Sequence, residues 1–68
     1  MTHTNTYTVT GMTCGHCVSS VTEEVQEIPG VNAVDVVLDT GAVTVTSEDP
    51  IDEAIMRVAV EEAGYQLA

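Results

Sequence analysis

The sequence predicts an α+β fold of the ferredoxin-like class, in which two helices cover one face of a four-stranded antiparallel sheet. Three observations lead to this prediction. Stretches in which apolar and polar residues alternate indicate strands, and two stretches with apolar residues every three or four positions indicate helices. The third observation is their order, β-α-β-β-α-β, which is that of the split βαβ motif with both helices on one side of the sheet.

The first strand and the first helix follow each other across a short loop. In residues Thr6–Thr10, threonines alternate with an aromatic and a β-branched residue, and Gly11 ends this strand. From about His16 the apolar spacing changes to four, four and three, which is typical of an amphipathic helix that buries one stripe: Cys17, Val21, Val25 and Ile28. Pro29 and Gly30 end the helix.

The middle of the chain predicts a β-hairpin. Apolar residues alternate over Val34–Leu38 and again over Val43–Thr46, and the tight-turn sequence Asp39–Gly41 separates the two strands. Because side chains alternate between the two faces of a strand, one face of the sheet should be polar and exposed. Its expected members are Thr6, Thr8, Thr10, Asp35, Thr44 and Thr46.

The last part of the chain predicts a second helix and a short fourth strand. Asp49 is a suitable N-cap and Pro50 suits the first helical position. Gly64 is a plausible C-terminal glycine, and residues 65–68 suffice for one short strand. The expected buried stripe of this helix is Ile51, Ala54, Ile55, Val58, Ala59 and Ala63.

Composition limits the function classes. The chain has 68 residues and a net charge of −10, with Arg57 as its single Lys or Arg. We expect one domain over residues 1–68 and no nucleic-acid binding, because phosphate recognition requires basic residues. The acidity also argues against docking on anionic membranes. No basic, apolar leader or membrane-length apolar run is visible, so we expect a cytoplasmic protein that does not insert into membranes.

Both cysteines lie in the stretch "GMTCGHC", residues 11–17. Cys14 falls in the loop and Cys17 at the start of the first helix, where unpaired backbone N–H groups and the helix dipole favour thiolate. Gly11 and Gly15 allow a tight loop that leaves the sulfurs near solvent. In a reducing compartment such a pair more often binds metal or carries out chemistry than forms a structural disulfide.

The number of ligands separates the candidate metals. Structural Zn(II) and iron–sulfur clusters require four ligands, whereas the chain offers two cysteines with His16 beside them. Two soft thiolates suffice for Cu(I), which we therefore favour. Zn(II) stays open through a dimer or through His16 and water, and a redox pair or a local disulfide stays open as well.

The motif resembles that of the heavy-metal-associated domain family. The full sequence "YTVTGMTCGHC" between a first strand and a first helix, the "IPGV" after that helix and the "EEAGY" before the last strand together make this resemblance specific. It extends from about Tyr7 to the end of the chain. Within the family, the chain is similar to bacterial copper chaperones of the CopZ type.

The resemblance implies roles for five residues. The metal thiolates of the family fall on Cys14 and Cys17, its loop methionine on Met12, and its aromatic residue near the metal on Tyr65. We expect Met12 to pack under the loop and Tyr65 to divide its ring and hydroxyl between core and loop. His16 occupies a variable position, which we interpret as an exposed neighbour rather than a ligand.

The resemblance also implies a function. The chain would carry Cu(I) to a copper-transporting P-type ATPase and would not be an enzyme. Cys14 would engage the incoming thiolate first and Cys17 would release the metal last. Alternatives are an N-terminal metal-binding domain of such an ATPase, or a carrier of Zn(II) or Hg(II), although Thr13 replaces the Asp of many zinc-linked members. A monomer and a copper-bridged homodimer both stay open.

The charged residues of the two helices raise separate expectations. Arg57 can form i,i+4 ion pairs with Glu53 and Glu61. Three acidic residues lie toward the C-terminal end of the first helix, where negative charge opposes the dipole: Glu23, Glu24 and Glu27. Since helix stability does not explain them, we hypothesise that they meet a basic patch on the metal acceptor. The eukaryotic chaperones of the family carry lysines near the site, and this chain has none.

Overall fold

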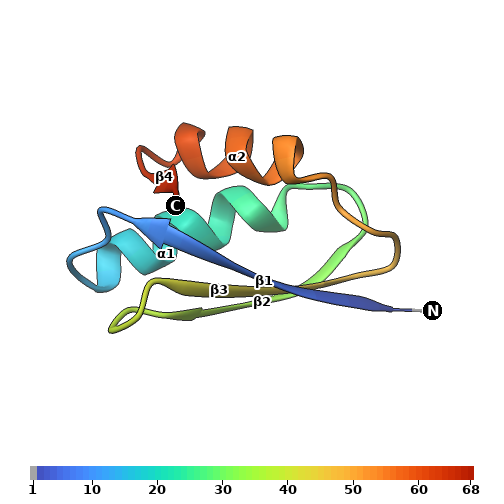
Figure 1. Cartoon of the computed structure of the whole chain (residues 1–68), viewed down its shortest axis with the longest axis horizontal. Helices are drawn as coiled ribbons and strands as arrows, with labels where there is room; N and C mark the ends of the chain where they lie inside the picture. Colours follow the sequence, from blue (N-terminus) through green and yellow to red (C-terminus); the bar gives the residue numbers. More distant parts are fainter. Residues whose placement is uncertain (1) are drawn as a thin grey trace.

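A computed structural model describes residues 2–68 and contains the predicted ferredoxin-like fold. Its four strands form an antiparallel sheet in the order β2-β3-β1-β4 (Figure 1). The strands are β1 (His3–Thr10), β2 (Val31–Val37), β3 (Ala42–Ser47) and β4 (Gln66–Leu67). β3 lies between β2 and β1, the two longest strands, so the β2–β3 hairpin and β1 form the main body of the sheet.

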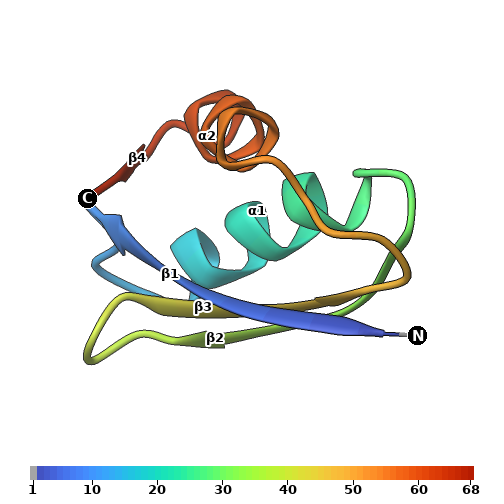
Figure 2. The same cartoon turned by 45° about the vertical axis from the view of Figure 1, so that its right-hand side comes forward.

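Two helices, α1 (Gly15–Gln26) and α2 (Glu53–Glu62), cover the same face of the sheet (Figures 1 and 2). They run in opposite directions, so that the end of α1 lies beside the start of α2 (Figure 1). The loop that contains Cys14 is at the other end of α1. The fold therefore separates the cysteine loop from the surface formed by the end of α1 and the start of α2.

The core lies between the helices and the sheet, as the alternation and the helical stripe predict. β-Branched side chains dominate it because they pack well on a pleated sheet. Its buried members are Val9, Val21, Val25, Val43, Val45, Met56, Ala59 and Val60. The opposite face of the sheet is polar, as expected: Thr6, Thr8 and Thr10 are exposed, and the Thr6 and Thr44 hydroxyls are 3.2 Å apart.

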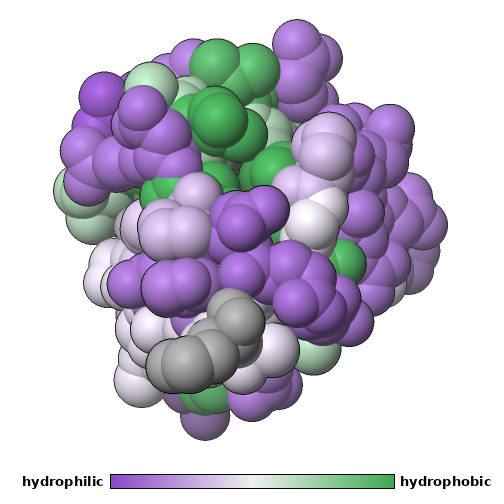
Figure 3. All heavy atoms as spheres, turned by 90° about the vertical axis from the view of Figure 1, so that its right-hand side faces the viewer, coloured by the Kyte–Doolittle hydropathy of each residue, from purple (hydrophilic) through white to green (hydrophobic). Residues whose placement is uncertain are grey.

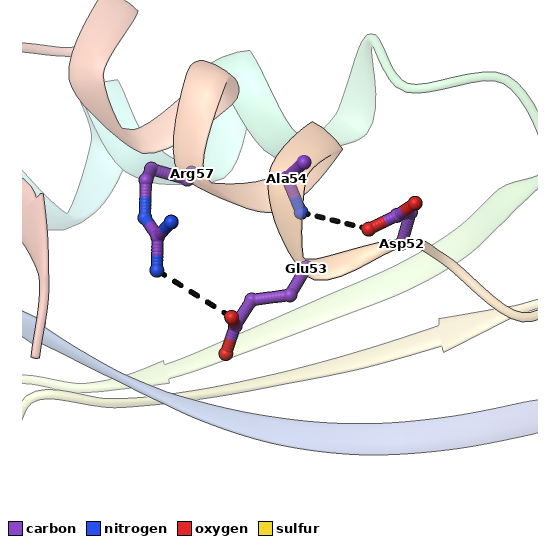
Figure 4. A network of polar contacts seen from close by, with 4 residues as sticks. All are labelled: Asp52, Glu53, Ala54 and Arg57. Carbon is purple, nitrogen blue, oxygen red and sulfur yellow. Dashed lines mark hydrogen bonds and ion pairs between the residues drawn. The ribbon is translucent and has the colours of Figure 1, made fainter.

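The predicted start of the second helix is wrong by three residues. Asp52, not Asp49, is the N-cap: its backbone is extended, and its Oδ1 accepts a hydrogen bond from the Ala54 backbone N–H at 3.0 Å (Figure 4). The Asp49 carbonyl instead accepts a hydrogen bond of 2.7 Å from the buried Ser47 hydroxyl. This bond closes a turn after β3, so Pro50 lies in the connection before the helix.

The predicted buried stripe of this helix is also partly wrong. Met56 and Val60 are fully buried, whereas Ile55 and Val58 are 49% and 58% exposed. Apolar residues occupy two neighbouring stripes of α2, and periodicity alone does not show which one faces the sheet. Of the predicted stripe, Ala59 is buried and Ile51 and Ala63 are partly buried against the core, but Ala54 is exposed.

Smaller differences concern the ends of elements. β1 starts at His3 rather than at Thr6, because β3 is long enough to pair with it as far as Ser47. α1 ends at Gln26, and Ile28 packs against the core from the turn that follows it. β2 begins at Val31, and Leu38 lies in the hairpin turn.

The single basic residue forms one of its two predicted ion pairs. The Arg57 guanidinium is 3.4 Å from a Glu53 carboxylate oxygen, on the exposed side of α2 (Figure 4). A pair this exposed contributes about 0.3–0.5 kcal/mol to stability. Neither helix within residues 2–68 is both long enough and apolar enough to cross a membrane.

Candidate metal site

The two thiols meet where the first loop enters α1. β1 ends at Thr10, and Gly11 turns the chain with a φ of 93°, a conformation that favours glycine. Cys14 is the N-cap of α1, with an extended backbone and a carbonyl that accepts hydrogen bonds from the N–H groups of Cys17 and Val18. The first turn of the helix therefore fixes Cys17 relative to Cys14.

The sulfur atoms of Cys14 and Cys17 are 3.7 Å apart, and both cysteines are free. Their environments differ, because Cys14 is exposed whereas Cys17 is 8% exposed and lies on the buried side of α1. The site thus presents one sulfur to solvent and holds the other against the protein. The expectation that both sulfurs lie near solvent is therefore wrong for Cys17, because its place in the apolar stripe of α1 turns it toward the core.

Thr13 contributes to the site in a way that the sequence analysis missed. Its backbone N–H donates a hydrogen bond to the Cys17 sulfur at 3.5 Å, and its hydroxyl is 3.8 Å from the same atom. Backbone N–H donors are present at almost every residue, so composition gives no sign of which one will face a sulfur. The available signal was the position of Thr13 in the loop, four residues before Cys17.

These contacts favour the charged form of one thiol. The pKa of Cys17 is lowered from its ordinary value of 9.0 to about 6, chiefly because the Thr13 N–H donates to the sulfur. The Tyr65 hydroxyl and Cys14 act in the same direction, and burial opposes them. The same contact with Cys17 raises the pKa of the Tyr65 hydroxyl, with smaller contributions from burial and the cysteine charges. The thiolate form of Cys17 is therefore favoured more strongly than in an ordinary cysteine.

The other predicted site residues occupy three different positions. Tyr65 and Met12 are half-buried and pack against the core, and the Tyr65 ring also covers the turn at Gly11. His16 is exposed on the first turn of α1, where it lines a hollow of about 330 Å³ with Ser19, Ser20 and Glu23. The structure therefore places Tyr65 over the turn that begins the cysteine loop and Met12 against the core, while His16 lies on the solvent-exposed side of α1.

The described part of the chain offers the thiols no third His, Cys, Asp or Glu ligand. Within residues 2–68, no group of three or more His, Cys, Asp or Glu side chains is arranged to hold a metal ion. The donor set of the loop is thus two sulfurs, one of which carries a lowered pKa. Such a set suits soft metal ions.

Comparison with known proteins agrees with this geometry. The family model of the heavy-metal-associated domain matches residues 6–66. The chain belongs to the heavy-metal-associated domain family. Among its relatives, the copper chaperone CopZ of Staphylococcus aureus is 40% identical over 60 residues, which cover 87% of this chain and 88% of that protein.

Solved structures show the same heavy-metal-associated fold. A CopZ metallochaperone superposes with a TM-score of 0.90 at 36% identity, over 97% of this chain and all of the other. A copper-binding domain from HMA7, a P-type ATPase, has a TM-score of 0.86 at 30% identity, over 96% and 89% of the two chains. The CopZ metallochaperone and the HMA7 domain thus share the architecture of this chain.

Proposed function

We propose that this chain binds Cu(I) through Cys14 and Cys17 and transfers it to a copper-transporting P-type ATPase. The observation that carries the proposal is the pair of free sulfurs 3.7 Å apart at the start of α1, one exposed and one with a pKa of about 6. Family membership and the similarity to copper chaperones support it.

The preference for Cu(I) rests on the donor set. Thiolate is a soft ligand, and Cu(I) accepts two of them, whereas structural Zn(II) requires four ligands. Since no third His, Cys, Asp or Glu completes a cluster within the described residues, Zn(II) would need water or a second chain. Two similar proteins, the copper chaperone CopZ and the copper-binding domain from HMA7, are named for copper, which also favours Cu(I) here. A copper-bridged homodimer would arise if the exposed Cys14 sulfurs of two chains shared the metal.

Transfer would proceed by ligand exchange without any change in a substrate bond, so we propose a carrier rather than an enzyme. An incoming thiolate binds the metal, a three-coordinate bridge forms, and a donor sulfur leaves, as in thiol–disulfide exchange. The exposed Cys14 meets the incoming thiolate first. Cys17 releases the metal last, because the Thr13 N–H and the helix start hold it in place.

The neighbouring side chains would adjust this exchange without binding the metal. The Tyr65 hydroxyl helps to lower the pKa of Cys17, so it would compete mildly with the metal for that sulfur. Met12 supports the loop from the core side. His16, exposed on the first turn, lies where a partner would approach Cys14.

The remaining proposals concern the domain organisation, the cellular compartment and the alternative functions. Residues 1–68 would form one domain, and the free thiols suit the reducing cytoplasm. The alternative of an N-terminal ATPase domain is supported by the similarity to the HMA7 domain, at 30% identity against 40% for the chaperone. A carrier of Zn(II) or Hg(II) would use the same two sulfurs.

The deciding experiment is an anaerobic titration of the reduced protein with Cu(I) against a competing chelator, read by native mass spectrometry, with Zn(II) in parallel. We expect one Cu(I) per chain at low loading and complete loss in the Cys14→Ser, Cys17→Ser double variant. The matched control is Ser19→Ala, Ser20→Ala beside the loop, which should bind as the parent does. A preference for Zn(II), or binding as weak as in the double variant, would refute the proposal.

A further inference from the structure

A groove of about 480 Å³ lies between the end of α1 and the start of α2. Figure 3 views the molecule from this end and shows hydrophobic side chains gathered at the top, with hydrophilic residues on both sides. The apolar wall includes Ile28, Ile55 and Val58. The rim carries three carboxylates, from Glu24, Glu27 and Glu62. We call this feature the interhelix groove.

Exposure of the apolar wall of the interhelix groove to water is energetically unfavourable. Ile55 and Val58 are 49% and 58% exposed, although Met56, Ala59 and Val60 of the same helix are buried. If α2 only covered the sheet, polar residues would be expected at positions 55 and 58. An exposed apolar patch with a polar rim is typical of a protein–protein contact.

The acidic rim is not explained by the stability of the helices. Glu24 and Glu27 lie at the C-terminal end of α1, where negative charge opposes the dipole and no basic residue is in the last turn. The only Lys or Arg of the chain, Arg57, is paired with Glu53 on another side of α2. Within residues 2–68, no Lys or Arg side chain therefore neutralises the carboxylates of the rim.

We propose that the interhelix groove docks a basic amphipathic helix of another protein. Apolar side chains of such a helix would cover Ile55 and Val58, and its Lys or Arg side chains would meet the rim carboxylates. This is the usual helix-in-groove mode of recognition. A second copy of this chain would bring further carboxylates and a single arginine, and an anionic membrane would be repelled by the same rim.

The interhelix groove is separate from the thiol pair. Along α1, Cys17 and Glu27 are ten residues apart, or about 15 Å at the rise of an α-helix. The groove and the thiol loop thus lie at opposite ends of α1 (Figure 1). The proposal does not depend on the metal that the thiols bind, and it divides the acidic residues of α1, since Glu23 faces the hollow beside His16 while Glu24 and Glu27 face the groove.

The test uses the full chain and a synthetic peptide of about four helical turns, with leucines on one face and lysines on the other. A peptide of identical composition with scrambled order controls for charge alone. Binding is measured by fluorescence anisotropy at physiological ionic strength, and the contact surface is mapped by amide chemical shifts. We expect saturable binding, tighter than that of the scrambled peptide, with the largest shifts in Glu24–Pro29 and Ala54–Glu62.

Matched variants decide the location. Ile55→Ser, Val58→Ser should weaken binding about tenfold. Val37→Ser, Leu38→Ser, at the exposed end of β2 and in the turn after it, should change binding less than about twofold. Glu24→Gln, Glu27→Gln should weaken it more than Asp35→Asn, Asp39→Asn, which removes the same charge elsewhere.

Three outcomes would overturn the proposal. Equal binding of the scrambled peptide would show attraction by net charge alone. Largest shifts at the thiol loop or on the sheet would place the site elsewhere. Self-association of the chain that Ile55→Ser, Val58→Ser abolishes would identify a second copy as the occupant.

Discussion

The backbone N–H of Thr13 donates to the Cys17 sulfur at 3.5 Å, and this bond distinguishes the two thiols of the loop. It exists because Cys14 caps α1, so that the first helical turn brings Cys17 back under the preceding loop residue. A main-chain donor is held by the fold and cannot rotate away. The protein therefore anchors one sulfur and favours its charged form, while Cys14 stays exposed.

The first prediction concerns pH. Alkylation of Cys17 in the metal-free folded protein should increase with a midpoint near pH 6, against about 9 in denaturant, since thiolate is the reactive form. Quenched iodoacetamide labelling followed by peptide mass spectrometry measures both midpoints at this one residue. A folded-state midpoint near 9 would contradict the role of the Thr13 N–H.

The same shift predicts how stability depends on pH. A pKa that is lower in the folded state means that the thiolate contributes stability, fully present above pH 9 and lost as the pH falls through about 6. The free energy of unfolding of the parent minus that of Cys17→Ala should therefore increase between pH 6 and pH 9. Urea unfolding at several pH values measures it, and a difference that is flat over this range would contradict the prediction.

The second prediction separates the hydroxyl of Tyr65 from its ring. Tyr65→Phe should raise the alkylation midpoint of Cys17, because the hydroxyl helps to lower the pKa of that thiol, while the ring keeps its packing over Gly11. Stability should change by less than about 1 kcal/mol. Tyr65→Ala, the control, should cost about 2 kcal/mol through lost packing of the half-buried ring. An unchanged midpoint in Tyr65→Phe would show that the hydroxyl does not act on the thiol.

Much of the fold and the position of the thiol pair could be predicted from the sequence, because each depends on local patterns. Alternation gave the strands, the stripe of Cys17, Val21 and Val25 gave the buried face of α1, and the motif placed both cysteines at the start of that helix. The bond from Thr13 could not be predicted, since it depends on the path of the loop.

The second helix shows where local patterns fail. Asp49 and Asp52 are both good N-caps, and the turn closed by Ser47 decides between them. Two apolar stripes on α2 could each face the sheet, and packing against the strands selects the one with Met56 and Val60. Such choices are made by contacts between elements, which a single sequence does not display.

The third prediction tests which apolar stripe of α2 faces the sheet. Met56→Ala should destabilise the protein by about 2–5 kcal/mol, because Met56 is fully buried in the core. Ile55→Ala, at the position directly before Met56, removes a side chain that is half exposed and should cost about 1 kcal/mol or less. Urea unfolding of both variants measures the difference. Equal costs would mean that the orientation of α2 differs from that described.

The fourth prediction concerns Gly41 in the β2–β3 turn. Its φ is 74°, it is buried, and a Cβ there would collide with the Val9 carbonyl oxygen in the neighbouring strand. The Val9 N–H also donates to the Gly41 carbonyl at 2.8 Å, so the turn cannot move away without breaking that bond. Gly41→Ala should therefore combine backbone strain with a steric clash and cost at least about 2 kcal/mol.

Gly30→Ala is the matched control for this turn. Gly30 has a φ of 90°, but nothing lies within 4 Å of a Cβ built there. Gly30→Ala therefore introduces backbone strain without a steric clash, and it should destabilise the protein by about 1 kcal/mol. The excess for Gly41→Ala measures the clash with Val9, and chemical denaturation of both variants yields it. Equal costs would mean that the turn and β1 can separate, and that the close approach of Val9 to Gly41 does not constrain the end of β1 from which the cysteine loop begins.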